Sequence, residues 1–369
     1  MKTGRGRIGR GMAALGAALL LAGCAGMPGP RAERCVASDA MPDIVVDPAT
    51  GEHMTTLSVL IYNVEGLPWP ARSNRGYRLD EIARQLAQLR AEGRAPQVVL
   101  LQEAFTRRAA RIPVEAGYPN YVRGPTRSER LSRAEMAEEA PRLPGRRSFR
   151  RGERFGTFLS SGLAAASDFP ILAHWTEPFH RRECAGYDCL ANKGVMMVRV
   201  WLPGVPAPVD IFNTHLNSRR STGVPEERSL AAHRLQTDRG AEFIDRYRDP
   251  ANPLIFGGDF NMAEAPDRMV HFFDRKPWPI VHHWCLVVAR DCQIKMSWDG
   301  DEPWMDTQDL QGFDQGERVR IRPIRIEAMF DEPWRGAPLA DHDGLLVTYR
   351  LSWSADAAPP PSRCRPEGL

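Results

Sequence analysis

The sequence predicts a mixed α/β domain, because apolar runs typical of strands recur along most of the 369-residue chain and segments with helical periodicity lie among them. Some of these runs alternate between apolar and polar residues, whereas others are continuously apolar. We therefore expect both half-exposed strands and strands buried on both faces. The expected strands are residues 57–64, 97–103, 161–167, 194–202, 209–216, 254–261, 324–330 and 344–351.

Two segments have the periodicity of amphipathic helices. In residues 77–93, apolar side chains recur on one helical face and Gly93 provides a C-terminal stop. Residues 226–247 carry a looser apolar stripe. The apolar positions are Leu79, Ile82, Leu86 and Leu89 in the first segment, and Leu230, Leu235, Phe243, Ile244 and Tyr247 in the second.

Residues 1–23 have the pattern of an export signal, in which basic residues precede an apolar run too short to span a bilayer. The run closes with the letters LAGC, which resemble the lipobox of bacterial lipoproteins. That resemblance implies a lipid on Cys24 and attachment to the bacterial cell envelope, most simply to the outer membrane. A plain secretory signal is the alternative. Residues 24–54 begin with a glycine- and proline-rich stretch that suits a flexible tether.

The charge of the chain gives little indication of a partner. The formal net charge is +3, but residues 1–23 hold four basic residues and no acids, so the remainder has 45 basic and 46 acidic residues. A nearly neutral domain has no general attraction for nucleic acid or anionic membranes. Residues 123–154 are an exception, with ten arginines and five glutamates. We expect a long surface loop there, which either contacts phosphates or anionic head groups or is simply solvated.

Beyond Cys24 the chain has six cysteines, an even number that fits three disulfides in an exported protein. Six cysteines allow 15 pairings. Short separations favour Cys184–Cys189 and Cys285–Cys292, which would leave Cys35 to join Cys364. A zinc site is less favoured, because the cysteines are scattered.

Polar side chains end one expected strand after another. Ligand sites in α/β proteins gather at such strand ends, where loops converge on one point. A turn would explain any one of these residues, but not the repeated pattern. The residues are Asn63, Glu103, Lys193, His215, Asp259, Asn261, Asp341 and His342.

These residue types suit metal-assisted phosphoryl chemistry. The Glu103 carboxylate and the Asn63 amide oxygen are hard ligands that suit Mg²⁺, and a bound metal can offset charge on a phosphodiester oxygen. A histidine beside a carboxylate, such as His342 beside Asp341, can remove a proton from water near neutral pH. Glu327 is a further candidate to orient His342.

The order of the segments IYNV, LLQE, NTHL, GGDFN and LADHDG resembles the endonuclease/exonuclease/phosphatase superfamily, which includes deoxyribonuclease I and neutral sphingomyelinases. The resemblance covers residues 56–351. It implies an α/β fold of the deoxyribonuclease I type, a four-layer sandwich of two packed mixed β-sheets flanked by helices. We therefore expect a catalytic domain over residues 55–354 and a C-terminal tail over residues 355–369.

The resemblance also implies roles for individual residues. Asn63, Glu103 and Asp341 would hold a Mg²⁺ ion or another hard divalent cation. Asp259 and Asn261 would position water and phosphate, and His342 would be the base. His215 would stabilise the transition state, and Lys193 would contact the phosphate or cap a strand near Asp188. The chain departs from the family pattern in having Ala340 where serine is usual and Glu327 where aspartate is usual.

The segment CAGYDCLANKGVMMVRV, residues 184–200, is similar to a segment of bacterial sphingomyelinases. It favours a phosphodiesterase acting on a phospholipid such as sphingomyelin. The alternatives are an extracytoplasmic nuclease of the same superfamily, with nucleic acid as a possible but less favoured partner, and an anchored binding protein without activity. We expect a monomer.

Overall fold

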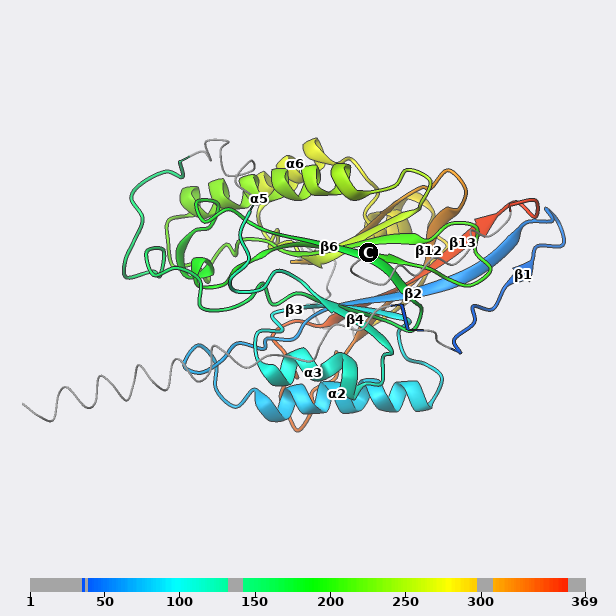
Figure 1. The fold of residues 1–369 in the computed structure, drawn as a ribbon, viewed down its shortest axis with the longest axis horizontal. Coiled ribbons are helices and arrows are strands. Elements are labelled where there is room, and N and C mark those ends of the chain that lie inside the picture. Colours follow the sequence, from blue (N-terminus) through cyan, green and yellow to red (C-terminus); the bar gives the residue numbers. More distant parts are fainter. Residues whose placement is uncertain (1–34, 37–38, 132–141, 297–307, 358–369) are drawn as a thin grey trace, which may run out of the picture.

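The computed structural model describes residues 35–36, 39–131, 142–296 and 308–357. Within them, the strands form an eight-stranded sheet and a five-stranded sheet that lie face to face (Figure 1). Both sheets mix parallel and antiparallel pairs, as the sequence predicts.

The large sheet has the order β10-β12-β13-β2-β3-β5-β4, and β1 pairs with β2 at one end. Its central strands are β2 and β3, which run parallel, so that Asn63 and Gln102 are neighbours at the same end. The strands are β1 (Val45–Val46), β2 (His53–Asn63), β3 (Val98–Gln102), β4 (Asn120–Arg123), β5 (Ala164–Ser167), β10 (Gln293–Lys295), β12 (Arg320–Met329) and β13 (Gly344–Trp353).

The small sheet has the order β11-β9-β8-β7-β6. Its β8 and β9 are parallel, so they too end side by side. The strands are β6 (Ile171–Pro178), β7 (Gly194–Val200), β8 (Val209–His215), β9 (Leu254–Asp259) and β11 (Asp309–Asp314).

Helices cover the two outer faces. α2 (Gly76–Ala91) and α3 (Arg107–Glu115) pack on the large sheet, whereas α5 (Glu226–Tyr247) and α6 (Pro266–Arg275) pack on the small sheet (Figure 1). This is the expected four-layer sandwich. Shorter helical turns are η1 (Gly186–Leu190), α7 (Val281–His283) and the π-helical η2 (Trp284–Val288). No helix of the described residues is long and apolar enough to cross a membrane.

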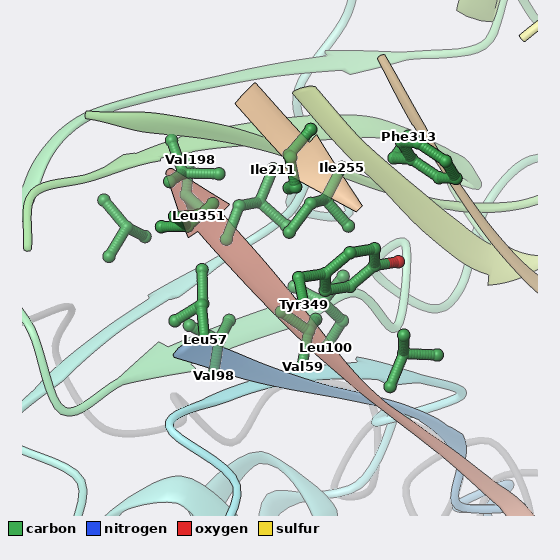
Figure 2. Close-up of a cluster of buried hydrophobic side chains, with 14 of the residues drawn as sticks. Leu57, Val59, Val98, Leu100, Val198, Ile211, Ile255, Phe313, Tyr349 and Leu351 are labelled. Carbon is green, nitrogen blue, oxygen red and sulfur yellow. The ribbon is translucent and has the colours of Figure 1, made fainter. Parts of the chain in front are cut away.

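The central core lies between the sheets. Apolar side chains of β2 and β13, such as Leu57, Val59 and Leu351, face Ile211 and Ile255 of the small sheet (Figure 2). Each fully buried aliphatic side chain of this kind stabilises the fold by about 1.5–3 kcal/mol. The core thus holds the two sheets in a fixed relation, and with them the strand ends.

Two glycines of β9, Gly257 and Gly258, let this strand approach β8 and β2 closely. A Cβ at Gly258, which has φ +140°, would lie 2.1 Å from the backbone oxygen of Thr214 on β8. A Cβ at Gly257 would lie 2.8 Å from Cγ2 of Ile61 on the other sheet. Both glycines before Asp259 are therefore required, because a Cβ there would collide with Thr214 or with Ile61.

All of the expected strands and both expected helices are present, with ends that differ by a few residues. The sequence pattern does not predict α3, α6, β1, β4, β6, β10 or β11. In α3 an internal proline, Pro113, hides a helix that Thr106 caps at its start. β11 was missed because Gly312 and its two terminal aspartates weaken the strand pattern.

The disulfides Cys184–Cys189 and Cys285–Cys292 are confirmed. Cys35 is also disulfide-bonded, and its expected partner Cys364 lies outside the described residues. The signal segment, Cys24 and residues 25–34 of the expected tether also lie outside them. The described part of the tether is bound to the domain, because β1 pairs with β2 and the Val36 backbone exchanges two hydrogen bonds with the Asn120 side chain. The expectation of a flexible tether is therefore wrong for this part.

The described part of the arginine-rich segment is tied to the domain. The Glu153 side chain is 1% exposed and accepts hydrogen bonds from Arg228 Nε at 2.7 Å and from the Gly186 backbone at 3.0 Å. This part of the segment is a surface loop, as expected, and Glu153 anchors it to the domain. Its exposed arginines include Arg146, Arg150, Arg151 and Arg154.

Candidate active site

Three polar residues form one row across the small sheet. His215 on β8 is the register partner of Asp259 on β9, and Asp259 is the partner of Asp309 on β11. All three are at most 5% exposed. The row exists because three neighbouring strands carry a polar residue at the same level, where the apolar core ends.

The large sheet contributes to the same place. Asn63, at the end of β2, donates from Nδ2 to Asp259 Oδ2 at 3.0 Å across the sandwich. Its amide oxygen accepts the Glu65 backbone N–H at 3.1 Å. Asn63 therefore joins the ends of the two sheets.

His342 enters the site from the loop before β13 and is held by a carboxylate. Its Nδ1 lies 2.5 Å from Asp309 Oδ2, whereas its Nε2 lies 3.9 Å from Asp341 Oδ1. Burial alone would lower the pKa of His342, but the charges of Asp309, Asp259 and Asp341 and the hydrogen bond to Asp309 outweigh it and raise the pKa well above 6.5. The orienting carboxylate is thus Asp309 rather than the adjacent Asp341.

Asp259 lies between the two histidines. Burial and the nearby Asp309 carboxylate raise the pKa of Asp259 above its ordinary value, against the opposing effects of His342, Lys193 and Asn63. Its Oδ1 accepts the Asn261 backbone N–H at 3.0 Å, and its Oδ2 lies 3.3 Å from His215 Nε2.

Lys193 is part of the site through His215. Its Nζ lies 2.9 Å from His215 Nε2 and 3.0 Å from Asp188 Oδ2, and it donates to the Leu216 backbone oxygen at 3.1 Å. Lys193 is 6% exposed. The expected pairing with Asp188 is thus present, and the phosphate contact of Lys193 stays a prediction that its place beside His215 allows.

Burial lowers the pKa of His215 well below 6.5, and the positive charges of Lys193 and His342 lower it further. A neutral His215 follows. Its Nδ1 is buried and has no hydrogen-bond partner among the described residues.

Asn261 has a backbone conformation that is uncommon for a residue with a side chain, with φ +52°. Its Nδ2 donates to the Leu216 backbone oxygen at 3.1 Å, and it is 5% exposed. Glu103, directly after β3, has φ +54°. Such residues cluster at functional sites, where the surrounding structure holds them in place.

Glu103 and Asp341 fit a hard divalent cation. The half-buried Glu103 carboxylate makes no hydrogen bond or ion pair within the described residues. Burial raises its pKa to about 7, with Lys193 and His342 opposing the rise and Asp341 adding to it. Asp341 is 49% exposed and pairs with Arg72 at 3.2 Å. A cation between Glu103 and Asp341 would compensate both charges.

A second group of donors lies next to this pair. Asp259, Asp309 and His342 each place one ligand atom within 4.8 Å of the others. Two of these three donors already bind one another, because His342 pairs with Asp309.

Glu327 takes no part in the site. Its carboxylate binds Lys295 Nζ at 2.6 Å and Arg325 at 2.5 Å, on the face of β12 that is turned away from the small sheet. The expectation that Glu327 orients His342 is therefore wrong, because the neighbouring strand β11 supplies Asp309 instead.

Asp309 is the functional residue that sequence reasoning missed. Only Gln308 separates it from residues 297–307, which lie outside the described residues, and β11 has no strong strand pattern. The signal that identifies the other residues is missing here, because Asp309 starts its strand and is preceded by polar residues instead of ending an apolar run.

Comparison with protein families gives a match over residues 60–359 to the model described as "Endonuclease/Exonuclease/phosphatase family". No curated protein matches the chain.

Solved structures share the fold. A Staphylococcus aureus beta toxin mutant with bound magnesium ions is 15% identical, with 81% of this chain and 100% of that chain covered and a TM-score of 0.54. Sphingomyelinase C from Streptomyces griseocarneus is 19% identical, with 79% and 99% covered and a TM-score of 0.55. D. rerio TDP2 complexed with a single-strand DNA product is 15% identical, with 80% and 98% covered and a TM-score of 0.51.

The family match spans most of the chain, and the two-sheet sandwich is shared with these structures. Members of the family are hydrolases that act on phosphodiester bonds. The chain belongs to the endonuclease/exonuclease/phosphatase family.

Proposed function

We propose that the protein is a metal-dependent phosphodiesterase that hydrolyses its substrate with an activated water. The observation that carries the proposal is the contact of 2.5 Å between His342 and Asp309, next to Asp259. The charge of His342 also acts on the Glu103 carboxylate, which has no hydrogen bond or ion pair among the described residues. This arrangement supplies a held base and an anionic pocket for a cation at one point of the fold.

His342 takes a proton from the attacking water at Nε2, because Nδ1 is occupied by Asp309. Asp309 holds the ring in place and stabilises the imidazolium that forms. Asp259, with a raised pKa, lies on the same side and orients the water through its carboxylate.

The residues around His215 stabilise the negative charge that develops on the phosphoryl oxygens. Lys193 brings a positive charge within 2.9 Å of His215 Nε2, and neutral His215 and the Asn261 amide are hydrogen-bonding groups at the same strand ends. Donors fixed in advance at the place where charge develops contribute much of the catalysis in such sites.

Glu103 and Asp341, with Asn63 behind them, would hold the cation, with Mg²⁺ the preferred ion. A bound cation polarises the phosphoryl oxygen and offsets its charge. Asn63 contributes mainly by fixing Asp259, since its amide oxygen already accepts a backbone hydrogen bond.

We favour a phospholipid such as sphingomyelin as substrate. Support comes from the fold shared with sphingomyelinase C and from the segment Cys184–Lys193, which here forms a disulfide-closed turn whose Asp188 holds Lys193. A nuclease is the second candidate, supported by the shared fold of TDP2 with its DNA product.

The experiment is a substrate panel with added Mg²⁺ and with a chelator. It should contain sphingomyelin, a glycerophospholipid, plasmid DNA, single-stranded DNA and an inositol phosphate. We expect choline phosphate release from sphingomyelin that the chelator abolishes. Nicking of DNA without lipid hydrolysis would select the nuclease, and silence on every substrate would contradict the proposal of an enzyme.

We further propose that the protein is exported and anchored through a lipid on Cys24, which rests on the LAGC segment alone. The Cys24→Ser variant should leave the membrane fraction while its hydrolytic activity is unchanged. Continued sedimentation with membranes would contradict the anchor.

A further inference from the structure

A cavity of about 350 Å³ lies on the outer face of the large sheet, away from the catalytic residues. It is lined by side chains of β12 and β13, by Gln293 of β10 and by Asp291. Val347, Tyr349 and Leu351 of β13 face the core between the sheets. Their neighbours Thr348 and Arg350 therefore point to the outer face, because side chains alternate along a strand.

An irregularity in β12 brings two arginines to this cavity. Arg322 and Arg325 are three residues apart, a spacing that places side chains on opposite faces of a regular strand. The register of β12 against β13 shifts between Pro323 and Arg325. This bulge turns Arg325 to the same face as Arg322, and both line the cavity.

Two like charges then lie directly opposite one another. Arg322 on β12 is the register partner of Arg350 on β13, and Arg325 is the partner of Thr348. Like charges in directly opposed cross-strand positions destabilise a sheet. An anion bound between the guanidinium groups would remove this cost.

The neighbouring acids neutralise the group only in part. Asp291 binds Arg322 at 2.8 Å, and Glu327 is shared between Arg325 and Lys295. Arg350 makes no hydrogen bond or ion pair within the part of the chain that the structure describes, and its only acidic neighbour in the lining is the Asp291 that already binds Arg322. The cavity therefore has an excess of positive charge and a guanidinium with free donors.

We propose that this cavity binds a phosphate group. Planar guanidinium groups donate pairs of parallel N–H bonds that match phosphate oxygens, and the Thr348 hydroxyl and the Gln293 amide supply further donors in the same lining. The ligand is either a soluble phosphate compound or the head group of an anionic lipid, which share this chemistry.

The site is separate from the catalytic centre. Arg350 lies six residues along β13 from Gly344, where the strand emerges from the loop of Asp341 and His342. Six residues of strand span roughly 20 Å. The proposal therefore does not depend on the proposed catalytic function.

The test compares the full wild-type chain with Arg350→Gln and, as a matched control, Arg318→Gln. Arg318 is exposed in the turn before β12, so its variant has the same loss of charge elsewhere. Pyrophosphate binding is measured by titration calorimetry in the presence of a chelator. We expect Arg350→Gln to lose one binding event or to weaken it about 10- to 100-fold, whereas Arg318→Gln binds as the wild type does.

Thermal unfolding gives a second readout. Without phosphate, Arg350→Gln should unfold at or above the wild-type temperature, because one of two opposed like charges is gone. With pyrophosphate, the wild type and Arg318→Gln should shift upward and Arg350→Gln should shift less.

Sedimentation with phosphatidylcholine vesicles, with and without phosphatidylglycerol, identifies the source of the phosphate. A loss of phosphatidylglycerol-dependent binding in Arg350→Gln assigns a lipid head group, and a loss confined to pyrophosphate assigns a soluble ligand. Identical behaviour of Arg350→Gln and Arg318→Gln toward both probes would overturn the proposal.

Discussion

The two halves of the active site treat their histidines in opposite ways. On the β11 side, His342 faces three carboxylates, which raise its pKa well above 6.5. On the β8 side, His215 is buried next to Lys193, and its pKa falls well below 6.5. Asp259 lies between them, since its Oδ2 is 3.3 Å from His215 Nε2 and its carboxylate also interacts electrostatically with His342.

The opposite shifts in pKa indicate which histidine can exchange a proton. A histidine held by a carboxylate is basic and oriented, whereas one held beside an ammonium group stays neutral and can only form hydrogen bonds. Pairs of titratable groups with pKa values pushed apart are the usual mark of separate acid–base and electrostatic roles.

The largest expected effect comes from His342→Ala, which should lower the rate by about 10²- to 10⁴-fold. As a base His342 must be neutral, so the wild-type rate should rise with pH through a midpoint above 6.5. That acidic limb should vanish in His342→Ala.

His215→Ala is the matched variant, and it should lose about 10²- to 10³-fold in rate while keeping the limb. The pKa of His215 is lowered well below 6.5 by burial, so the limb above 6.5 belongs to His342 and remains when His215 is removed. Rate–pH profiles of both variants decide the matter. If the acidic limb disappears in His215→Ala instead, the roles of the two histidines are exchanged. If both variants keep the limb, Asp259 is the base.

Asp309→Asn should lower the rate by about 10²-fold and move the acidic limb to lower pH, because the carboxylate that most strongly raises the pKa of His342 is removed. Glu327→Gln is its control, since Glu327 binds Lys295 and Arg325 and not His342. A rate–pH profile changed by Glu327→Gln and not by Asp309→Asn would restore the assignment that the sequence alone suggests.

Burial is the main cause of the low pKa of His215, and the positive charge of Lys193 is the second. Lys193→Met removes only the second cause, so the pKa of His215 should rise in part toward its ordinary value. We expect a loss in rate of about tenfold, the size of one weakened charge-assisted hydrogen bond. Histidine resonances followed by NMR as a function of pH measure the shift directly. An unchanged His215 titration would mean that Lys193 acts on the substrate alone.

The smallest effect on the reaction is expected at His233, a buried histidine of α5 whose pKa is lowered like that of His215 but which is not one of the proposed catalytic residues. Burial lowers its pKa to about 3, and its Nε2 lies 2.8 Å from the Phe260 oxygen. A depressed histidine stabilises the fold above pH 6.5, and this stability is lost as pH falls from 6.5 toward 3, because the unfolded chain binds the proton first.

The loss amounts to on the order of 4 kcal/mol for a buried group of this kind. His233→Gln should therefore flatten the decline in unfolding free energy between pH 6.5 and 4 in denaturant titrations, while the exposed His283→Gln unfolds as the wild type does. An equal decline in both variants would contradict the prediction.

Much of the fold could be predicted from the sequence, because its central strands are apolar runs bounded by turn residues. Strands 57–64 and 97–103 were identified in this way. Weakly patterned segments could not be identified, since β11 owes its strand conformation to pairing with β9 along its whole length. Pairing of this kind is a tertiary effect that a short window of sequence does not contain.

The site was predictable to a similar degree and for a related reason. Residues that end strong strands, such as Asn63, His215 and Asp259, were recognisable, and the structure brings them together. Asp309 was not, because it reaches His342 only through the sheet register. Glu327 shows the reverse error, since a familiar position along the chain does not fix which strand supplies the carboxylate.

The disulfide Cys184–Cys189 encloses Asp188, which accepts Lys193 Nζ at 3.0 Å and the Ser218 backbone N–H at 2.6 Å. The covalent link therefore shapes the neutral-histidine half of the site and leaves the His342–Asp309 half untouched. With the roles proposed above, a thiol reductant would act on the two halves unequally. It would loosen the loop that holds Asp188 and Lys193, and it would spare proton transfer at His342.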